Sequence, residues 1–172
     1  MATAETMQTT KQQPQPALAE LEAFIHHEVR LLDERRFDEW MDLFSDDGYY
    51  WAPTQPGQES PLRTASLFYD DRQAMKARFA RLKHPRIHVQ TPPSRTRHFV
   101  SGVQLETPQS PDECRVSSSF IMLEYRPGYE QCLFGGQFLY RLRYADGRLK
   151  IVAKRVELIN CDASFGAMAV PF

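Results

Sequence analysis

PPSRTRHFVS, at residues 92–101, is the stretch where the pattern of the chain changes. Before its prolines, apolar residues recur at steps of three and four, which is the spacing of amphipathic helices. After them, apolar and polar residues alternate in runs that are separated by turn residues, which is typical of strands. This order predicts an α+β domain in which three helices precede a sheet and pack on one of its faces.

The first two helices are predicted from apolar stripes. The first stripe consists of Leu18, Leu21, Ile25, Val29 and Leu32. It predicts an amphipathic helix over residues 18–35, with Glu28 among the polar residues between the apolar positions. A second stripe runs from Phe37 to Phe44 over two turns, and SDDG at residues 45–48 ends it.

The link to the third helix contains a strand and a loop. YYWA at residues 49–52 is aromatic and strand-like, and the stretch 53–61, which contains proline, glycine and serine, indicates a loop. Asp70, with Gln73 three residues later, resembles a capping box for the third helix. Pro85 is expected to stop that helix.

Four strands follow the prolines and are expected to form a meander. Their predicted ranges are 95–106, 113–126, 131–144 and 148–160. The last hairpin is the clearest, because Asp146 and Gly147 supply the positive φ values of a tight turn.

Two features of the strand region are harder to interpret. Gly135 and Gly136 lie inside a strand pattern, which indicates a β-bulge. Between Val116 and Tyr125 both alternating sets are largely apolar, so we expect this strand to be covered on both faces. Helices cover one face; the outer cover is either a loop or another subunit.

Length and composition indicate a single domain. The chain has 172 residues, 42% hydrophobic and 25% charged, so residues 18–172 suffice for one core. Residues 1–17 are polar and rich in Gln, Thr and Pro, and we expect a disordered tail. Three cysteines make a poor disulfide framework, and there is neither a signal peptide nor an apolar run of about 18 residues. A cytoplasmic protein is expected.

The formal charge of -1 hides two opposite blocks. Residues 20–47 contain ten acidic and three basic residues, whereas residues 72–98 contain eight Lys or Arg and no acid. Nucleic acid is a generic partner for a basic block, but Phe79 is its only aromatic residue, so stacking platforms are missing. A solvated helix face and an acidic protein partner remain open.

No metal or cofactor site is expected on this chain. A Rieske cluster needs paired Cys and His, and no Cys here has a His within three residues. A mononuclear iron needs two His and a carboxylate, and His84 and His88 are separated by a proline without a nearby acid.

A general acid/base pair needs only one oriented His and one carboxylate in an apolar pocket. The candidate bases are His26, His27 and His98, with Asp33, Glu28 or Asp162 as possible partners. A satisfied structural His is the alternative interpretation, and it is the more common case for a His on an amphipathic element.

Several segments together resemble a known family. They are LLDERRFDEW at 31–40, YWAP at 50–53, PPSRTRHFVS at 92–101, KRVELINCD at 154–162 and PF at 171–172. This set is similar to the small (β) subunit of bacterial aromatic-ring-hydroxylating (Rieske non-haem iron) dioxygenases. The likeness runs from about Leu18 to the end, and the segment at 92–101 is its most specific part.

The resemblance implies a fold, partners and a division of labour. The fold would be a cone of the nuclear-transport-factor-2-like (cystatin-like) type, with a curved mixed or antiparallel sheet around a long helix. The chain would join catalytic α subunits and other β subunits in an α3β3 hexamer, with no nucleic acid or membrane as partner. The α subunit would carry the [2Fe-2S] Rieske cluster and the mononuclear Fe(II), and ferredoxin and reductase would act indirectly.

Under this resemblance, the residues of interest are contacts between subunits. Arg95, Arg97 and His98 are candidates because Arg side chains form bidentate bonds to carboxylates. Strand alternation places the two Arg on one side and His98 on the other, so they should not share a partner. Trp51 and Phe172 are possible apolar anchors. The alternatives are an internal ion pair for the Arg residues and a core position for Trp51.

A different function remains open for the same fold. A free-standing dehydratase or isomerase would use a His-carboxylate pair in the cone. That hypothesis requires a cavity lined for a ligand, whereas a cone packed solid with aromatic and aliphatic side chains excludes it.

Overall fold

The computed structural model describes residues 16–84, 90–110, 112–166 and 168–172. Its elements, in chain order, are α1 (Leu18–Asp33), α2 (Phe37–Asp42), β1 (Phe44–Pro53), β2 (Ser66–Asp71), α3 (Arg72–Leu82), β3 (Arg95–Ser110), β4 (Glu113–Tyr125), β5 (Cys132–Ala145) and β6 (Arg148–Leu158). None of the helices in these ranges is both long and apolar enough to cross a membrane. Most of the predicted tail at 1–17, and Pro85, lie outside the described residues.

The strands form one mixed sheet in the order β2-β1-β6-β5-β4-β3. The meander from β3 to β6 is confirmed, since each of these strands pairs antiparallel with the next. β1 pairs parallel with β6, and β2 then adds antiparallel to β1. β2 was not predicted, because its sequence SLFYDD is short and ends in two acids that also begin a helix.

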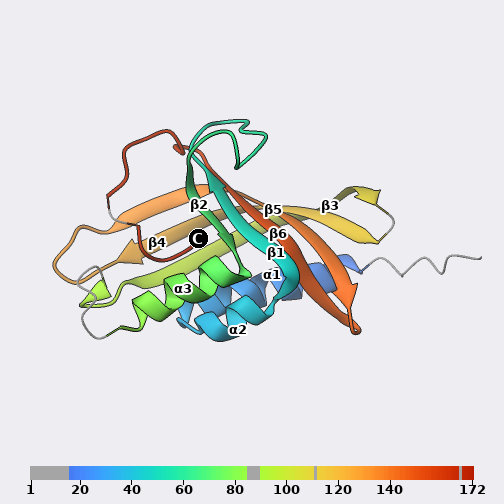
Figure 1. Ribbon diagram of the computed structural model, residues 1–172, viewed down its shortest axis with the longest axis horizontal. Coiled ribbons are helices and arrows are strands. Elements are labelled where there is room, and N and C mark those ends of the chain that lie inside the picture. Colours follow the sequence, from blue (N-terminus) through green and yellow to red (C-terminus); the bar gives the residue numbers. More distant parts are fainter. Residues whose placement is uncertain (1–15, 85–89, 111, 167) are drawn as a thin grey trace, which may run out of the picture.

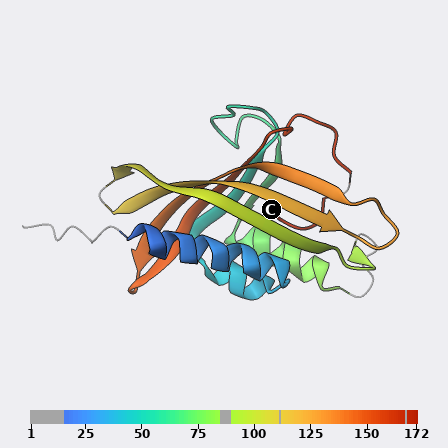
Figure 2. The same cartoon turned by 180° about the vertical axis from the view of Figure 1, so that it is seen from behind.

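All three helices cover the same face of the sheet (Figure 1). The sheet curves over them, and α1 runs along the inside of β3, as the reverse view in Figure 2 shows. The apolar stripe of α1 explains this position, because Leu21, Ile25 and Leu32 are buried against the sheet.

Two element boundaries differ from those predicted from the sequence. Residues 45–48 do not form a turn after α2; they belong to β1, which has an irregular register between Phe44 and Tyr49. The capping residue of α3 is Asp71 and not Asp70, because the Asp71 side chain accepts a hydrogen bond from the Ala74 N–H at 2.8 Å. Asp70 instead forms an ion pair with Arg78.

Of the two predictions that rest on glycines, the tight turn and the β-bulge, only the first is confirmed. Asp146 and Gly147 have φ values of 50° and 72°, which confirms the tight turn between β5 and β6. The bulge predicted at Gly135 and Gly136 is wrong, because β4 and β5 pair without a register shift there. Gly136 is required for a different reason: a Cβ at this position would lie 1.9 Å from the backbone oxygen of Glu157.

Aromatic rings fill the space between the helices and the sheet. Phe37 and Phe79 stack at 4.5 Å between centroids and join α2 to α3. Phe120 and Phe138 stack at 3.9 Å on neighbouring strands. Trp40 contacts both layers of this core, and it is almost fully buried. The inside of the cone is therefore a packed core.

The opposite face of the sheet carries exposed apolar side chains. Phe99, Ile121 and Leu133, on β3, β4 and β5, are 57%, 48% and 66% exposed. Beside them lies an apolar groove of about 590 Å³, lined in part by Gly135 and Ile159. Among the described residues no loop covers these three side chains, and cover by another subunit stays a prediction.

Replacing Gly135 and Gly136 by alanine, one at a time, tests whether the β6 backbone leaves no room for a side chain at Gly136. Gly136→Ala is expected to lower the free energy of unfolding by about 1–3 kcal/mol, because its Cβ meets backbone that must move. Gly135→Ala is the matched control, since the nearest atom to its Cβ would be 3.5 Å away, and its effect should stay below about 1 kcal/mol. Urea unfolding measures both. Equal losses would show that Gly136 has no special packing role.

Candidate functional site

A fully buried lysine occupies the centre of the concave face. Lys154 lies on β6, where its neighbours in register are Tyr140 on β5 and Tyr50 on β1. Its ammonium group lies 4.2 Å from the centroid of the Phe138 ring and within 6 Å of the rings of Trp40 and both tyrosines. A lysine is almost never buried to this extent without a partner.

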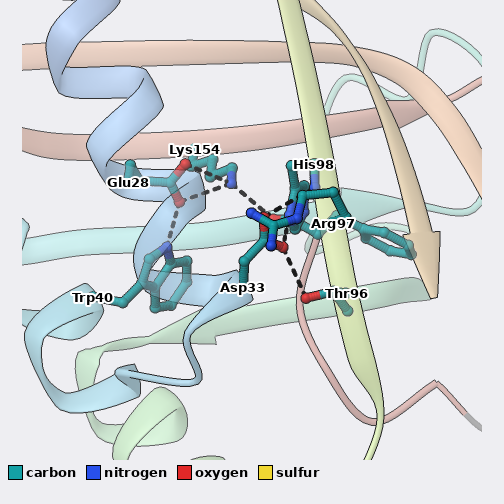
Figure 3. A network of polar contacts seen from close by, with 8 residues as sticks. Glu28, Asp33, Trp40, Thr96, Arg97, His98 and Lys154 are labelled. Atoms are coloured by element: carbon teal, nitrogen blue, oxygen red, sulfur yellow. Dashed lines mark hydrogen bonds and ion pairs between the residues drawn. The ribbon is translucent and has the colours of Figure 1, made fainter. Parts of the chain in front are cut away.

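The partner is Glu28, which projects from α1 and is also fully buried. Lys154 Nζ donates to the two carboxylate oxygens of Glu28 at 2.8 and 3.0 Å. Trp40 Nε1 also donates to this carboxylate (Figure 3). Tyr140 OH is a further donor to it, at 3.0 Å. The carboxylate therefore accepts from three side chains that come from α2, β5 and β6.

Every donor of the Lys154 ammonium has an acceptor. Two go to Glu28, and a third bond at 2.7 Å reaches the backbone oxygen of Phe172. Burial lowers the pKa of Lys154, and the attraction of Glu28 opposes this. Burial and the adjacent Glu28 carboxylate both raise the pKa of Tyr140, so its hydroxyl stays a donor.

A second pair links α1 to β3. Asp33, five residues after Glu28, accepts from the backbone N–H of His98 at 3.0 Å and from the Thr96 hydroxyl at 2.9 Å. Its carboxylate also lies 2.7 Å from His98 Nδ1. Figure 3 shows the two acid-base pairs side by side along the sheet-facing side of α1. Of the predicted bases, the structure thus brings His98 to Asp33.

The His98 imidazole is fully buried. Its side chain has no solvent exposure, and its Nε2 is buried without a hydrogen-bond partner among the described residues. Burial raises the pKa of the Asp33 carboxyl, but the bonds from His98 and Thr96 outweigh it, so that the pKa lies below its usual value. The arrangement is that of a general base, but the imidazole is fully buried among the described residues.

The two arginines of the stretch at residues 92–101 lie at the surface. The Arg97 side chain is 68% exposed, and its guanidinium reaches Asp33 only at 4.0 Å. Arg95 is also exposed, with its guanidinium 5.5 Å from the centroid of the Tyr125 ring. Contrary to expectation, Arg97 and His98 both contact Asp33, although they are consecutive residues of β3.

The expected apolar anchors are buried within the chain. Trp51 is covered by Arg155, whose guanidinium lies 4.4 Å from the ring centroid, and its Nε1 donates to the Ser66 hydroxyl. Phe172 is 1% exposed inside the cone. Neither ring, nor the His98 imidazole, offers a surface to another subunit in this conformation. Arg95 and Arg97 are the interface candidates that remain exposed.

The other candidate bases and the cysteines do not assemble into a site. His26 Nδ1 bonds to the backbone oxygen of Glu22 and His27 pairs with Arg30, both on the exposed side of α1. The three cysteines are free thiols. Within the described ranges, no group of three His, Cys, Asp or Glu side chains converges as metal ligands.

The opposite charge blocks partly neutralise each other within the chain. Lys83 of the basic block bonds to Asp38 at 2.5 Å, and Arg72 approaches Asp42 at 3.8 Å. These contacts join α3 to α2. Their exposure makes each worth about 1 kcal/mol or less, so they orient the helices more than they stabilise them.

Sequence reasoning missed the Glu28–Lys154 pair, although a signal was present. Glu28 is in helical phase with Leu21, Ile25 and Leu32, on the apolar side of α1. Lys154 alternates in phase with Val156 and Leu158, which are part of the core. A single polar residue on each of two apolar faces indicates a buried pair.

A family model described as "Ring hydroxylating beta subunit" matches residues 27–163 of this chain. Among the curated relatives is the small oxygenase component of the p-cumate 2,3-dioxygenase system of Pseudomonas putida. It is 34% identical over 139 residues, which are 80% of this chain and 76% of the relative. The family match thus includes the C-terminal part of α1, the whole sheet and both buried pairs.

Solved structures share the fold. The β subunit of benzoate 1,2-dioxygenase from Burkholderia mallei has a TM-score of 0.70 and 30% identity, covering 86% of this chain and 94% of that one. A hexachlorocyclohexane dehydrochlorinase from Novosphingobium barchaimii has a TM-score of 0.57 at 14% identity, covering 82% and 85%, and shows likeness of fold alone. The expected nuclear-transport-factor-2-like fold, with helices on a curved mixed sheet, is confirmed.

The lowered pKa of Asp33 predicts a pH-dependent contribution to stability. Because the folded pKa lies below the unfolded value of about 3.9, this stability is complete above that pH and is lost as the pH falls through the folded pKa. Asp33→Asn should cost about 1–3 kcal/mol at pH 7, and the difference from the wild type should shrink below about pH 4.

Urea unfolding at a series of pH values measures this difference. Asp46→Asn is the matched control, because Asp46 is exposed on β1, and its effect should be small throughout. A deficit for Asp33→Asn that stays constant down to the lowest pH would show that the charge of Asp33 contributes nothing.

Proposed function

The chain belongs to the family of β subunits of aromatic-ring-hydroxylating dioxygenases, and from this we propose that its own contribution to the oxygenase is structural. It holds catalytic α subunits in an α3β3 hexamer. One observation carries the proposal. The Glu28–Lys154 and Asp33–His98 pairs both join α1 to the sheet, and their side chains are buried. The chemistry then has to come from the partner subunit.

The side chains present do not fit the metal centres of such an oxygenase. In the described part of the chain, no three potential ligands converge, and the buried His98 already pairs with Asp33. We therefore place the [2Fe-2S] Rieske cluster and the mononuclear Fe(II) on the α subunit. Electrons from NAD(P)H would reach α through a reductase and a ferredoxin, without passing through this chain.

The outer face of the sheet supports contact with another subunit. Phe99 and Ile121 pair in register, and Leu133 continues the exposed apolar surface on β5. A soluble protein rarely leaves such a surface uncovered. Arg97 and Arg95 lie at its margin, where their guanidinium groups suit carboxylates of a neighbouring subunit.

We propose a single-ring aromatic acid as the substrate of the assembled oxygenase, acting in aromatic catabolism in the cytoplasm. The support is the chemistry named for two relatives, since p-cumate and benzoate are both single-ring acids. Selection of the substrate is assigned to α, because the His98 and Lys154 side chains have no solvent exposure in the described structure.

A free-standing dehydratase or isomerase is the weaker alternative. The Asp33–His98 pair has the geometry that such an enzyme needs, at 2.7 Å. However, stacked rings such as Phe120 and Phe138 pack inside the cone, and the His98 side chain has no solvent exposure.

Co-purification with α tests the assembly role. The wild-type chain should form a heterohexamer by light scattering, whereas Arg97→Ala should weaken the complex, the more so at raised salt. The isolated Arg97→Ala chain should melt like the wild type, because the ion pair with Asp33 is long and exposed.

Arg148→Ala is the matched control, because it removes the same charge from the exposed β5–β6 hairpin. It should leave assembly unchanged. If Arg97→Ala melts the isolated chain but leaves the complex intact, Arg97 is an internal structural residue. Oxygenase activity with stoichiometric iron in the isolated chain would overturn the structural role itself.

A further inference from the structure

The loop between β1 and β2, residues 54–65, projects from the sheet on the side away from the helices (Figure 1). Its turn at residues 61–63 carries Leu62, which is 81% exposed, and Arg63, which is also exposed. Within the part of the chain that the structure describes, no hydrogen bond or ion pair holds the Arg63 guanidinium. The loop therefore presents an apolar and a basic side chain at consecutive positions.

The loop is braced from inside by the buried side chain of Gln58. Its Oε1 accepts from the Thr54 N–H at 3.1 Å, and its Nε2 donates to the backbone oxygens of Ser60 and Thr64 at 3.2 and 3.3 Å. The Thr54 hydroxyl donates to the backbone oxygen of Ala65 at 2.7 Å, which closes the base of the loop. Because the loop is ordered by its own contacts, placing its turn against another surface costs little conformational entropy.

The apolar groove on the outer face of the sheet is a surface of complementary character. Ile121, Gly135 and Ile159 line it, and Glu157 is the one charged residue among the described residues of its lining. Its volume of about 590 Å³ lies within the range of about 300–1,000 Å³ that takes whole small molecules, so it has room for the turn of a loop.

The loop and the groove match in chemistry. Glu157 pairs through Oε1 with Arg155 at 2.5 Å, and its side chain is 36% exposed, so its second oxygen is available to a further cation. The turn of the loop offers one apolar side chain and one guanidinium to a groove with one carboxylate. Leu62 is too exposed to occupy the groove of its own chain, so the match has to be made between chains.

We propose that Leu62 and Arg63 of one copy of this chain dock in the groove of a second copy, with Leu62 against Ile121 and Ile159 and Arg63 beside Glu157. The loop and the groove are different surface patches, so the contact is heterologous, and its repetition around an axis closes a ring. The inference deepens the proposed function by naming the surfaces that join β subunits. The number of copies, three, rests on the proposed α3β3 assembly, whereas the contact itself does not.

Crosslinking between two differently substituted, co-expressed chains tests the contact. One chain carries Arg63→Cys and an affinity tag, the other carries Glu157→Cys, and in both Cys132 and Cys161 are replaced by Ser. A short bis-maleimide should join them into a mixed covalent dimer on a denaturing gel, with and without α. Arg148→Cys, on the exposed β5–β6 hairpin, replaces Arg63→Cys in the matched control and should give no mixed dimer above background.

Leu62→Asp tests the apolar part of the contact in a chain that keeps its native cysteines. A carboxylate placed against the apolar groove and beside Glu157 should raise the Kd of self-association on the order of tenfold in sedimentation velocity. Leu18→Asp is the matched control, because Leu18 is 49% exposed at the start of α1, and it should leave self-association unchanged. Both variants should melt like the wild type, since both leucines are exposed.

The inference is overturned if no mixed dimer forms with or without α, or if Leu62→Asp associates like the wild type. It is also overturned if Leu62→Asp loses α while its self-association is unchanged, because α would then be the occupant of the groove. The proposed function has a separate outcome. Chains that crosslink but never bind α keep this contact and contradict the α3β3 assembly, whereas an α3β3 complex without the crosslink contradicts this contact alone.

Discussion

The buried ion pair between Glu28 and Lys154 is the interaction on which the rest of the structure depends. It joins α1 to β6, and the same carboxylate accepts hydrogen bonds from Trp40 of α2 and Tyr140 of β5. The same ammonium holds Phe172. Removing one partner would leave an uncompensated charge at a fully buried position, and such a loss costs about 3–5 kcal/mol.

The buried polar residues of this chain join its elements to one another. The fold itself does not decide the function; the groups in its interior do. Here a carboxylate-lysine pair joins α1 to the inner strand β6, and a carboxylate-histidine pair joins it to the edge strand β3. The chain keeps its reactive groups closed and its outer sheet face apolar, which suits a subunit that organises others.

The elements that depend on a local pattern of apolar or turn residues could be predicted from the sequence. Leu21 and Ile25 place α1, and the Asp146-Gly147 turn fixes the last hairpin. β2 and the parallel β1–β6 pairing escaped prediction, because pairing between distant segments leaves no local pattern. For the site, strand alternation separates Arg97 from His98, yet their shared contact with Asp33 depends on side-chain reach. Glu28 and Lys154 escaped because each, taken alone, resembles an ordinary surface residue.

A double-mutant cycle on the buried pair tests the account most directly. Glu28→Gln and Lys154→Met are measured singly and together by urea unfolding, with assembly followed by light scattering. Each single variant should lose about 3–5 kcal/mol, whereas the double variant should lose much less than the sum, because neither charge is then left alone. Strictly additive losses, or single variants as stable as the wild type, would contradict the central role of the pair.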